Sequence, residues 1–145
     1  MANYRKGSHT ISRLTVHLVW VTKYRHKVLT GDVQERSRDL IRQDCQSMDV
    51  LILKGAVGHD HIHLHIEYPP KRSISSIVKQ LKGRSSRLLQ KEYPHLKRYY
   101  WGQRFWAKGF GAWSTGNITE KMVQEYIEHH RDTSSLDNDD FILEG

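Results

Sequence analysis

The sequence predicts one α+β domain with the split βαβ topology of ferredoxin-like (RRM-like) folds: an antiparallel sheet with helices on one face, plus an added C-terminal helix. Two observations predict it. Segments with strand and helix patterns follow in the order strand, helix, strand, strand, helix, strand, helix. The length of 145 residues suits a single core, and no repeat or long linker divides the chain. We expect one domain over residues 1–131 and an acidic tail over residues 132–145.

The first half of the chain contains three predicted strands and one helix. Residues 11–22 (ISRLTVHLVWVT) alternate and are rich in β-branched side chains, which is typical of a strand. Apolar residues then recur at helical spacing over residues 31–48. The apolar run 50–57 predicts a central strand. The strictly alternating run 59–67 (HDHIHLHIE) predicts the next strand, after a tight connection at Gly58.

The second half contains two predicted helices and one strand. Ser73 is suited to cap a helix over residues 74–91, in which apolar side chains form one face and basic side chains cover the rest. Residues 105–114 (FWAKGFGAWS) predict a fourth strand that glycines interrupt. Thr119 is suited to cap the last helix, which extends to His130.

The composition excludes several classes of protein. Four Trp, seven Tyr and three Phe are too many aromatic residues for a disordered chain. The single Cys45 excludes an internal disulfide and a cysteine-rich metal cluster. The sequence contains no apolar run of membrane length and begins without the apolar stretch of a secretory signal, so we expect a cytoplasmic protein with no membrane partner.

The charge is unevenly distributed along the chain. The formal net charge is +7, but residues 1–110 hold 21 basic and 8 acidic residues, whereas residues 111–145 hold 2 and 8. A basic body is typical of a protein that binds a polyanion, most often nucleic acid. An ordinary solvated surface has the same appearance, so charge alone leaves both interpretations open.

The predicted strand over residues 59–67 carries four of the ten histidines, at every second position from His59 to His65. On a strand these side chains share one face, and the apolar residues between them face the other way. Two neutral imidazoles at positions i and i+2 can chelate one divalent ion if a third ligand comes from elsewhere. Asp60 falls on the opposite face in this pattern and is not an obvious ligand. A single surface histidine commonly has no such role, so the pattern alone leaves a plain surface strand open.

The last predicted helix places Tyr126 and His130 one turn apart, about 6 Å along the axis. An amphipathic helix commonly buries such a tyrosine in the core, and that interpretation stays open. Alternatively, a metal held partly by His130 would lie close to the Tyr126 hydroxyl. Tyrosine is a weak nucleophile at neutral pH and needs such activation.

Together these motifs resemble the HUH single-tyrosine transposases, the TnpA enzymes of small bacterial insertion sequences and their REP-associated relatives. The resemblance rests on the histidine–hydrophobe–histidine strand His61-Ile62-His63, followed by a helix with Tyr126-x-x-x-His130. It extends over about residues 14–130. Further matching segments are 19–25 (VWVTKYR), 60–64 (DHIHL), 81–83 (LKG), 99–102 (YYWG) and 105–106 (FW).

The chain departs from the family pattern in two respects. The third ligand, four residues after the tyrosine, is often a glutamine in the family, whereas this chain has His130 with His129 beside it. His59 and His65 stand where the family tends to carry apolar or proline residues, and the resemblance assigns them no role.

The resemblance implies a metal-dependent single-strand DNA endonuclease and strand transferase that acts at insertion-sequence ends. Tyr126 would attack a phosphodiester, forming a 5′-phosphotyrosine and freeing a 3′-OH. The implied metal is Mg²⁺ or Mn²⁺, held by His61, His63 and His130. The implied partners are single-stranded DNA hairpins near the element ends and a second copy of the chain, a homodimer in which the tyrosine helix can act in trans.

The basic helix and its basic neighbours are the expected DNA-binding surface. The candidate DNA-binding residues are Lys23, Arg25, Lys79, Lys82, Arg84, Arg87 and Arg104. The alternative function is a catalytically silent or domesticated ferredoxin-like protein that binds single-stranded nucleic acid. A metal-buffering protein built on the histidines would leave the basic helix and the tyrosine unexplained.

Overall fold

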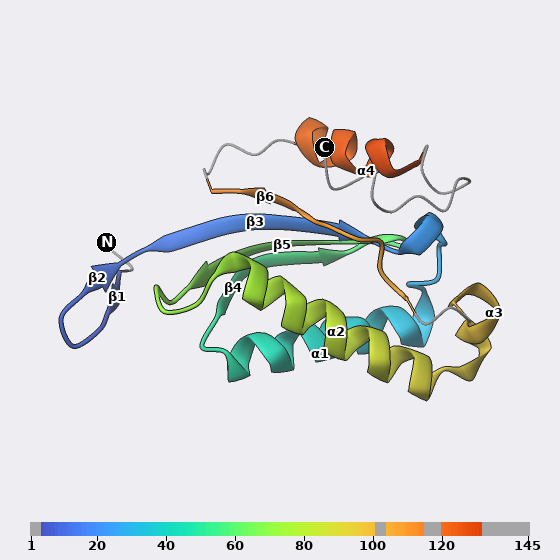
Figure 1. The fold of residues 1–145 in the computed structure, drawn as a ribbon, viewed down its shortest axis with the longest axis horizontal. Coiled ribbons are helices and arrows are strands. Elements are labelled where there is room, and N and C mark those ends of the chain that lie inside the picture. The colour runs from blue at the N-terminus through green and yellow to red at the C-terminus, as the bar shows by residue number, and fades with distance from the viewer. Residues whose placement is uncertain (1–3, 101–103, 115–119, 132–145) are drawn as a thin grey trace.

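A four-stranded antiparallel sheet organises the molecule, with its strands in the order β4-β5-β3-β6 (Figure 1). The computed structural model describes residues 4–100, 104–114 and 120–131, and the side chains of His130 and Arg131 lie outside this description. The four strands are β4 (Leu51–Val57), β5 (His61–Tyr68), β3 (Leu14–Val21) and β6 (Gly111–Trp113). The main helices are α1 (Gly31–Ser47), α2 (Ile74–Glu92) and α4 (Glu120–Arg131).

The connections between strands give the split βαβ topology. Helix α1 connects β3 to β4, and β5 lies between these two strands in the sheet; α2 lies between β5 and β6 in the chain, and β3 separates them in the sheet. Helices α1 and α2 cover one face of the sheet, and α4 lies over the other (Figure 1). The predicted ferredoxin-like fold class, with its added C-terminal helix, is confirmed.

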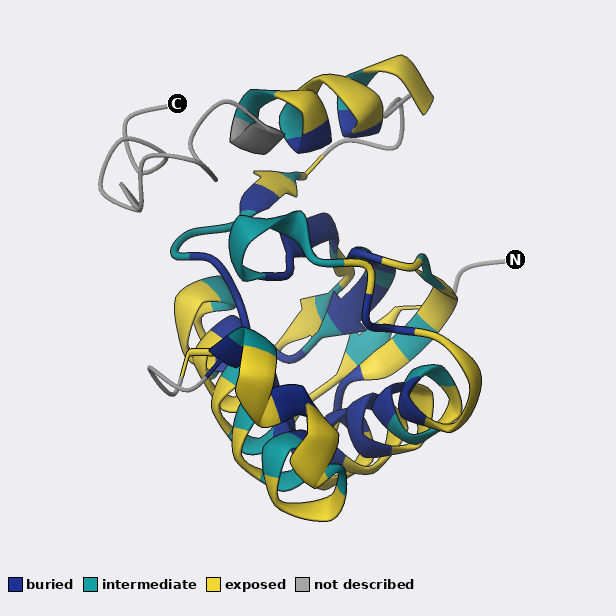
Figure 2. Ribbon diagram, turned by 90° about the vertical axis from the view of Figure 1, so that its right-hand side faces the viewer, coloured by how far each residue is buried: buried dark blue, intermediate teal, exposed yellow. Residues whose placement is uncertain are grey.

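The main core lies between the sheet and helices α1 and α2. In the antiparallel register of β3 and β5, Val16 pairs with Ile66, Leu18 with Leu64 and Trp20 with Ile62. Residues directly opposite one another share a face, so these six side chains point together at the two helices, and all are buried. The buried residues of α1 and α2 face this layer while their other sides are exposed (Figure 2).

A second, smaller apolar cluster lies on the other face of the sheet. It consists of Val19, Val21, Ala107, Val123 and Ile127, which are all buried. The last two residues belong to α4 and are four positions apart, so they lie on one side of the helix. Helix α4 is therefore held against β3 by apolar contacts. This places Glu120 of the same helix in the wall of the cavity that the histidines line.

Two predicted strands differ from the observed ones. The strand expected over residues 11–22 is interrupted at Arg13. Its first part, β2 (Ile11–Ser12), pairs instead with β1 (Arg5–Lys6) in a small hairpin. The strand expected over residues 105–114 is reduced to β6, because Trp106 makes only an isolated bridge with Thr22. Trp106 instead packs edge-on against Trp20, with ring centroids 6.0 Å apart, so tertiary packing overrides its strand propensity.

The histidine strand begins at His61, two residues later than the alternation predicts. The Gly58 N–H donates to the His61 carbonyl at 2.8 Å, which closes a tight turn between β4 and β5. The predicted cap of α2 is confirmed, since Ser73 Oγ accepts from the Ser76 N–H at 3.1 Å. Three short helices were not predicted: η1 (Lys23–Arg25), η2 (Pro94–Leu96) and α3 (Lys97–Tyr100).

Some expectations fall on parts of the chain that the structure does not describe. The proposed cap Thr119 and the acidic tail 132–145 lie outside the described residues. Within the described residues, no helix combines the length and apolar character that a membrane span requires.

Candidate active site

The alternation of β5 places His61, His63 and His65 on the face that α4 covers, and all three are half-buried. They line a cavity of about 340 Å³. The other lining residues are His17, Lys54, Gly55, Ala56, Glu120 and Val123. The cavity thus lies between strands β4 and β5 and the first turns of α4, and it brings several imidazoles, a lysine and a carboxylate together.

Asp60 and Gly58 fix the His61 imidazole from two sides. The Asp60 Oδ1 lies 2.9 Å from His61 Nδ1, and Asp60 Oδ2 accepts from Arg25 Nε at 3.2 Å and from Arg25 Nη2 at 3.0 Å. Burial pushes the pKa of Asp60 upward, but the hydrogen bonds from His61 and Arg25 outweigh it and hold this pKa below its usual value. A Cβ on Gly58 would lie 2.4 Å from His61 Cε1, so the ring rests on the glycine backbone. The expectation that Asp60 lies away from the histidines is wrong, because Asp60 precedes the strand and does not follow its alternation.

His63 has the character of a metal ligand. Burial lowers its pKa, and Glu120 across the cavity opposes this shift. The imidazole is therefore neutral at pH 7, as metal ligation requires. Its Nε2 atom is buried and has no hydrogen-bond partner among the described residues.

A fourth histidine, His17 of β3, extends the cluster and was not singled out from the sequence. Its ring stacks on that of His65, with centroids 3.9 Å apart and planes at 5°, and its centroid lies 5.7 Å from that of His63. Burial, followed by the charges of His65 and His63, lowers the pKa of His17 to about 4. His17 lies directly opposite His65 in the pairing of β3 with β5, so its side chain shares the histidine face of the sheet. Only this strand pairing reveals it. His65 thus packs against a neighbouring imidazole.

The third ligand that the resemblance implies is His130. His130 lies in the last turn of α4, on the correct face of the sheet, but its side chain is outside the described part of the structure. Among the residues that are described, no group of three His, Cys, Asp or Glu side chains lies close enough to hold a metal ion. His61 and His63 are two imidazoles on one strand face, and a metal ion bound to them would need further ligands.

Tyr126 lies on the same face of the sheet as the histidines but over a different strand. Its ring packs edge-on against Trp113 of β6, with centroids 6.3 Å apart and planes at 88°. A Cβ on Gly111 would lie 3.2 Å from Tyr126 Cδ1, so the glycine makes room for this ring. Strand β3 separates β6 from the histidine strand. Burial raises the pKa of Tyr126, which keeps the phenol neutral in this position.

Three of the predicted DNA-binding residues make hydrogen bonds to segments that are distant in the chain. Arg25 pairs with Asp60, as described above. Lys82 Nζ donates to the carbonyl oxygens of Ala107 and Gly109 at 2.8 and 2.9 Å, and so attaches that segment to α2. Arg84 Nη1 donates to Asp44 Oδ1 at 2.8 Å and joins α2 to α1. These contacts give the three cations a structural role that the sequence did not indicate.

The other four predicted DNA-binding residues lie in two places. Lys79 and Arg87 are exposed on α2 and line, with Arg84, a shallow groove on the outer side of this helix. That side faces away from the histidine cavity. Lys23 and Arg104 lie at the end of the sheet where β5 begins, because the Lys23 N–H donates to the Phe105 carbonyl at 2.9 Å.

Comparison with known proteins identifies the class of this chain. Residues 10–130 match the family model described as "Transposase IS200 like". The ISDra2 transposase TnpA of Deinococcus radiodurans is 34% identical over 128 residues, covering 88% of this chain and 91% of the relative. The transposase for insertion sequence element IS200 of Salmonella typhimurium is 32% identical over 136 residues, covering 94% and 89%. The chain belongs to the IS200-like transposase family.

Two solved structures share the fold. A crystal structure from Deinococcus radiodurans R1, described as that of a transposase, has a TM-score of 0.81 and 32% identity, covering 87% of this chain and 97% of the other. A REP-associated tyrosine transposase bound to a REP hairpin has a TM-score of 0.56 and 19% identity, covering 95% and 73%. The second likeness is one of fold alone. Membership of the family makes this protein a transposase, an enzyme of DNA transposition that cleaves DNA.

Proposed function

We propose that this transposase cleaves and rejoins single-stranded DNA at insertion-sequence ends through a 5′-phosphotyrosine on Tyr126, and that it recognises subterminal DNA hairpins. One observation carries the proposal: the imidazole pair and the tyrosine helix α4 share one face of the sheet and enclose a cavity there. A fold relative bound to a REP hairpin supports the choice of DNA partner. The alternative, a catalytically silent single-stranded nucleic-acid-binding protein, uses the same fold but has no need of this pairing.

The donor atoms at the site fit a divalent cation. His61 is fixed through Nδ1, and His63 is neutral with a buried Nε2, so both can offer a lone pair. We assign Mg²⁺ or Mn²⁺ to His61, His63 and His130, where the ion when bound would polarise the scissile phosphate. Glu120 adds a carboxylate to the wall of the same cavity.

The chemistry of the chain itself is a transfer between two phosphoesters. The Tyr126 oxygen attacks phosphorus and loses its proton, the P–O3′ bond breaks, and the departing oxygen takes up a proton as the 3′-OH. The phosphotyrosine keeps the energy of the bond, so rejoining to another 3′-OH needs no external energy source. Because Tyr126 packs over β6, it must move toward the histidine strand, or act on another protomer, before it reacts.

A homodimer is the assembly that best suits these surfaces. Strand β4 is one of the two edge strands of the sheet, and its Leu51 and Leu53 are 57% and 38% exposed. An exposed apolar edge strand is a template for pairing with another chain. In such a dimer the tyrosine helix of one protomer can act in trans on the histidine pair of its partner.

DNA binding is assigned to four of the predicted basic residues. Lys79 and Arg87 on α2 are available to phosphates, and Lys23 and Arg104 flank the end of the sheet where His61 lies. Because these contacts would be made to the DNA backbone, the affinity for a hairpin should fall as salt concentration rises.

The deciding experiment uses a labelled single-stranded DNA hairpin with Mg²⁺ or Mn²⁺. Tyr126→Phe should abolish both cleavage and the covalent protein–DNA adduct, seen as a band of lower mobility in a denaturing gel, while hairpin binding persists. His63→Ala should abolish metal-dependent cleavage. Tyr4→Phe is the matched control, because Tyr4 is exposed and lies outside the site. A wild-type protein that binds the hairpin but never forms the adduct would establish the silent binding protein instead.

A further inference from the structure

We propose that Asp60 is a positioning residue: its carboxylate holds the proton of His61 on Nδ1 and so directs Nε2 of the same ring toward the metal. The inference deepens the proposed function and rests on it for its biological purpose. It is carried by the 2.9 Å contact between Asp60 Oδ1 and His61 Nδ1, in a place where the carboxylate is buried.

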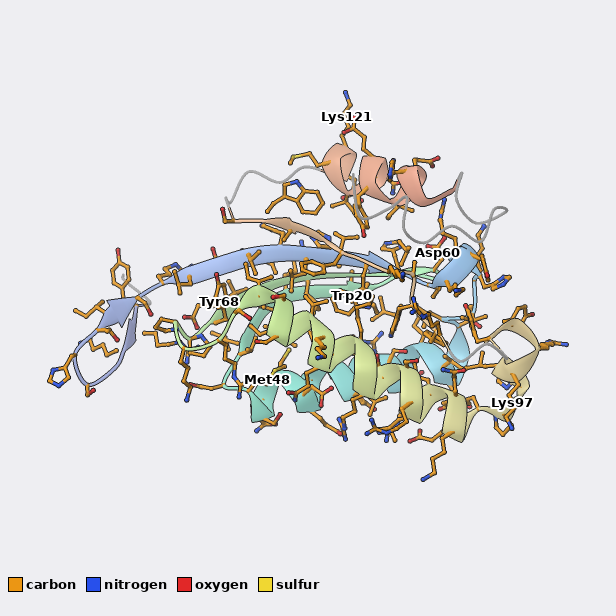
Figure 3. All side chains as sticks on the ribbon, in the orientation of Figure 1. Trp20, Met48, Asp60, Tyr68, Lys97 and Lys121 are labelled. Atoms are coloured by element: carbon orange, nitrogen blue, oxygen red, sulfur yellow. The ribbon has the colours of Figure 1, made fainter. Side chains whose placement is uncertain are left out.

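The arrangement of donors decides which ring nitrogen carries the proton. Asp60 lies at the end of the sheet beside η1 (Figure 3). Arg25 donates two hydrogen bonds to the Oδ2 atom of Asp60. A carboxylate that is paired with an arginine is ionised and can only accept. The nitrogen that faces Oδ1 must therefore be a donor, so in the neutral ring Nδ1 carries the proton and Nε2 keeps the lone pair.

The surroundings keep this contact in place. The Thr22 N–H donates to the Asp60 carbonyl at 2.9 Å, and the Thr22 hydroxyl donates to the His26 carbonyl at 2.8 Å. In η1, Tyr24 and Arg25 have positive φ angles of 60° and 53°, a left-handed turn that side chains rarely adopt. Such backbone conformations persist where surrounding contacts hold them. Here the ion pair between Arg25 and Asp60 is one such contact.

The consequence for Arg25 differs from the role predicted from the sequence. Its guanidinium is occupied by Asp60 and acts on the site through that carboxylate, in the manner of a partner that orients a metal-ligating histidine. Arg25 is therefore assigned to positioning and not to DNA contact.

The test measures the His61 tautomer directly in the full chain, without metal and without DNA. Long-range ¹H–¹⁵N correlation spectra distinguish a proton on Nδ1 from one on Nε2. Wild-type protein should show His61 protonated on Nδ1, and Asp60→Ala should move the proton to Nε2. Asp60→Asn keeps an oxygen acceptor and should keep the wild-type tautomer. Asp49→Ala is the matched control, because it also removes a carboxylate from an arginine pair but lies far from any histidine contact.

A second readout is Mn²⁺ affinity by calorimetry in the absence of DNA. Asp60→Ala should weaken Mn²⁺ binding by about 10- to 100-fold, with Asp60→Asn between it and the wild type, and Asp49→Ala unchanged. A wild-type His61 protonated on Nε2, or an Asp60→Ala variant with unaltered tautomer and affinity, would overturn the proposal. The wild-type spectrum decides even if Asp60→Ala fails to fold. Neither readout involves cleavage. A protein that forms no covalent adduct can therefore still show the Asp60 effect, and a cleaving protein can lack it.

Discussion

Gly58 shows how a residue without a side chain can shape a site. It lies against the His61 imidazole so closely that a Cβ would meet Cε1 at 2.4 Å and Nδ1 at 2.7 Å. Real Cβ atoms do not approach other heavy atoms this closely. Any other residue at position 58 would therefore displace the His61 ring from Asp60. The glycine is therefore required by the position of the His61 ring as much as by the turn that it closes.

Gly58→Ala should accordingly weaken Mn²⁺ binding at least tenfold, because the displaced His61 loses its partner. The crowding should also lower the free energy of unfolding by about 1–3 kcal/mol. Calorimetry and urea denaturation measure the two effects. Gly83→Ala is the control: a Cβ there meets nothing within 4 Å, so metal binding should not change and the helix should gain up to about 1 kcal/mol. Equal metal affinities for the two variants would refute this account.

At the scale of elements, two ion pairs join α1 to α2: Arg36–Glu92, and Arg84–Asp44, whose carboxylate is buried. Asp44 of α1 is 3% exposed, and Arg84 of α2 donates to its Oδ1 at 2.8 Å. Arg84→Ala should lower the free energy of unfolding by about 1–3 kcal/mol, since it leaves a buried carboxylate unpaired, with part of the effect relieved because Arg84 is partly solvated.

Arg87→Ala, one turn further along α2, should change stability by less than about 0.5 kcal/mol and should instead weaken hairpin binding. Denaturation curves and a binding titration on both variants separate the two roles. Equal stability losses would show that the exposed and the paired arginine do not differ in this way.

The elements also show where sequence patterns succeed. The period of two in β5 predicted which side chains share a face, because one face is buried in the core and the other faces the cavity. The same alternation extends back through His59, so local pattern could not show that the strand begins at His61. That boundary depends on a hydrogen bond between Gly58 and His61, and the short β6 depends on the packing of Trp106 against Trp20.

The candidate site was predictable in residue type and face but not in lateral position. Helical periodicity places Tyr126 on the arc that faces the sheet, yet it cannot say which strand lies beneath, and the ring rests over β6. The partners of Arg25 and Arg84 are 35 and 40 residues away, so no local pattern could separate these cations from exposed ones. His17 was missed for the same reason, since it joins the cluster only through strand pairing.

At the scale of the whole molecule, the exposed apolar residues of edge strand β4 predict a homodimer. Leu53→Lys places a charge on β4 where apolar side chains are exposed, and charged edge residues oppose pairing between sheets. Light scattering after gel filtration should show a dimer for the wild type and a monomer for Leu53→Lys. Ile11→Lys, which alters an exposed apolar residue of the β1–β2 hairpin, should remain dimeric. A dimeric Leu53→Lys, or a monomeric wild type, would exclude β4 as the interface.

The unequal apolar layers on the two faces of the sheet have an energetic consequence. Helix α4 contributes only Val123 and Ile127 to a cluster of five buried residues, whereas α1 and α2 share the large core. Elements with few buried contacts open locally at a lower free energy than the rest of a domain. Backbone amides of α4 should therefore exchange with deuterium well before those of β3 and β5. In that experiment the helix that carries the tyrosine should open as a separate cooperative unit while the sheet stays folded.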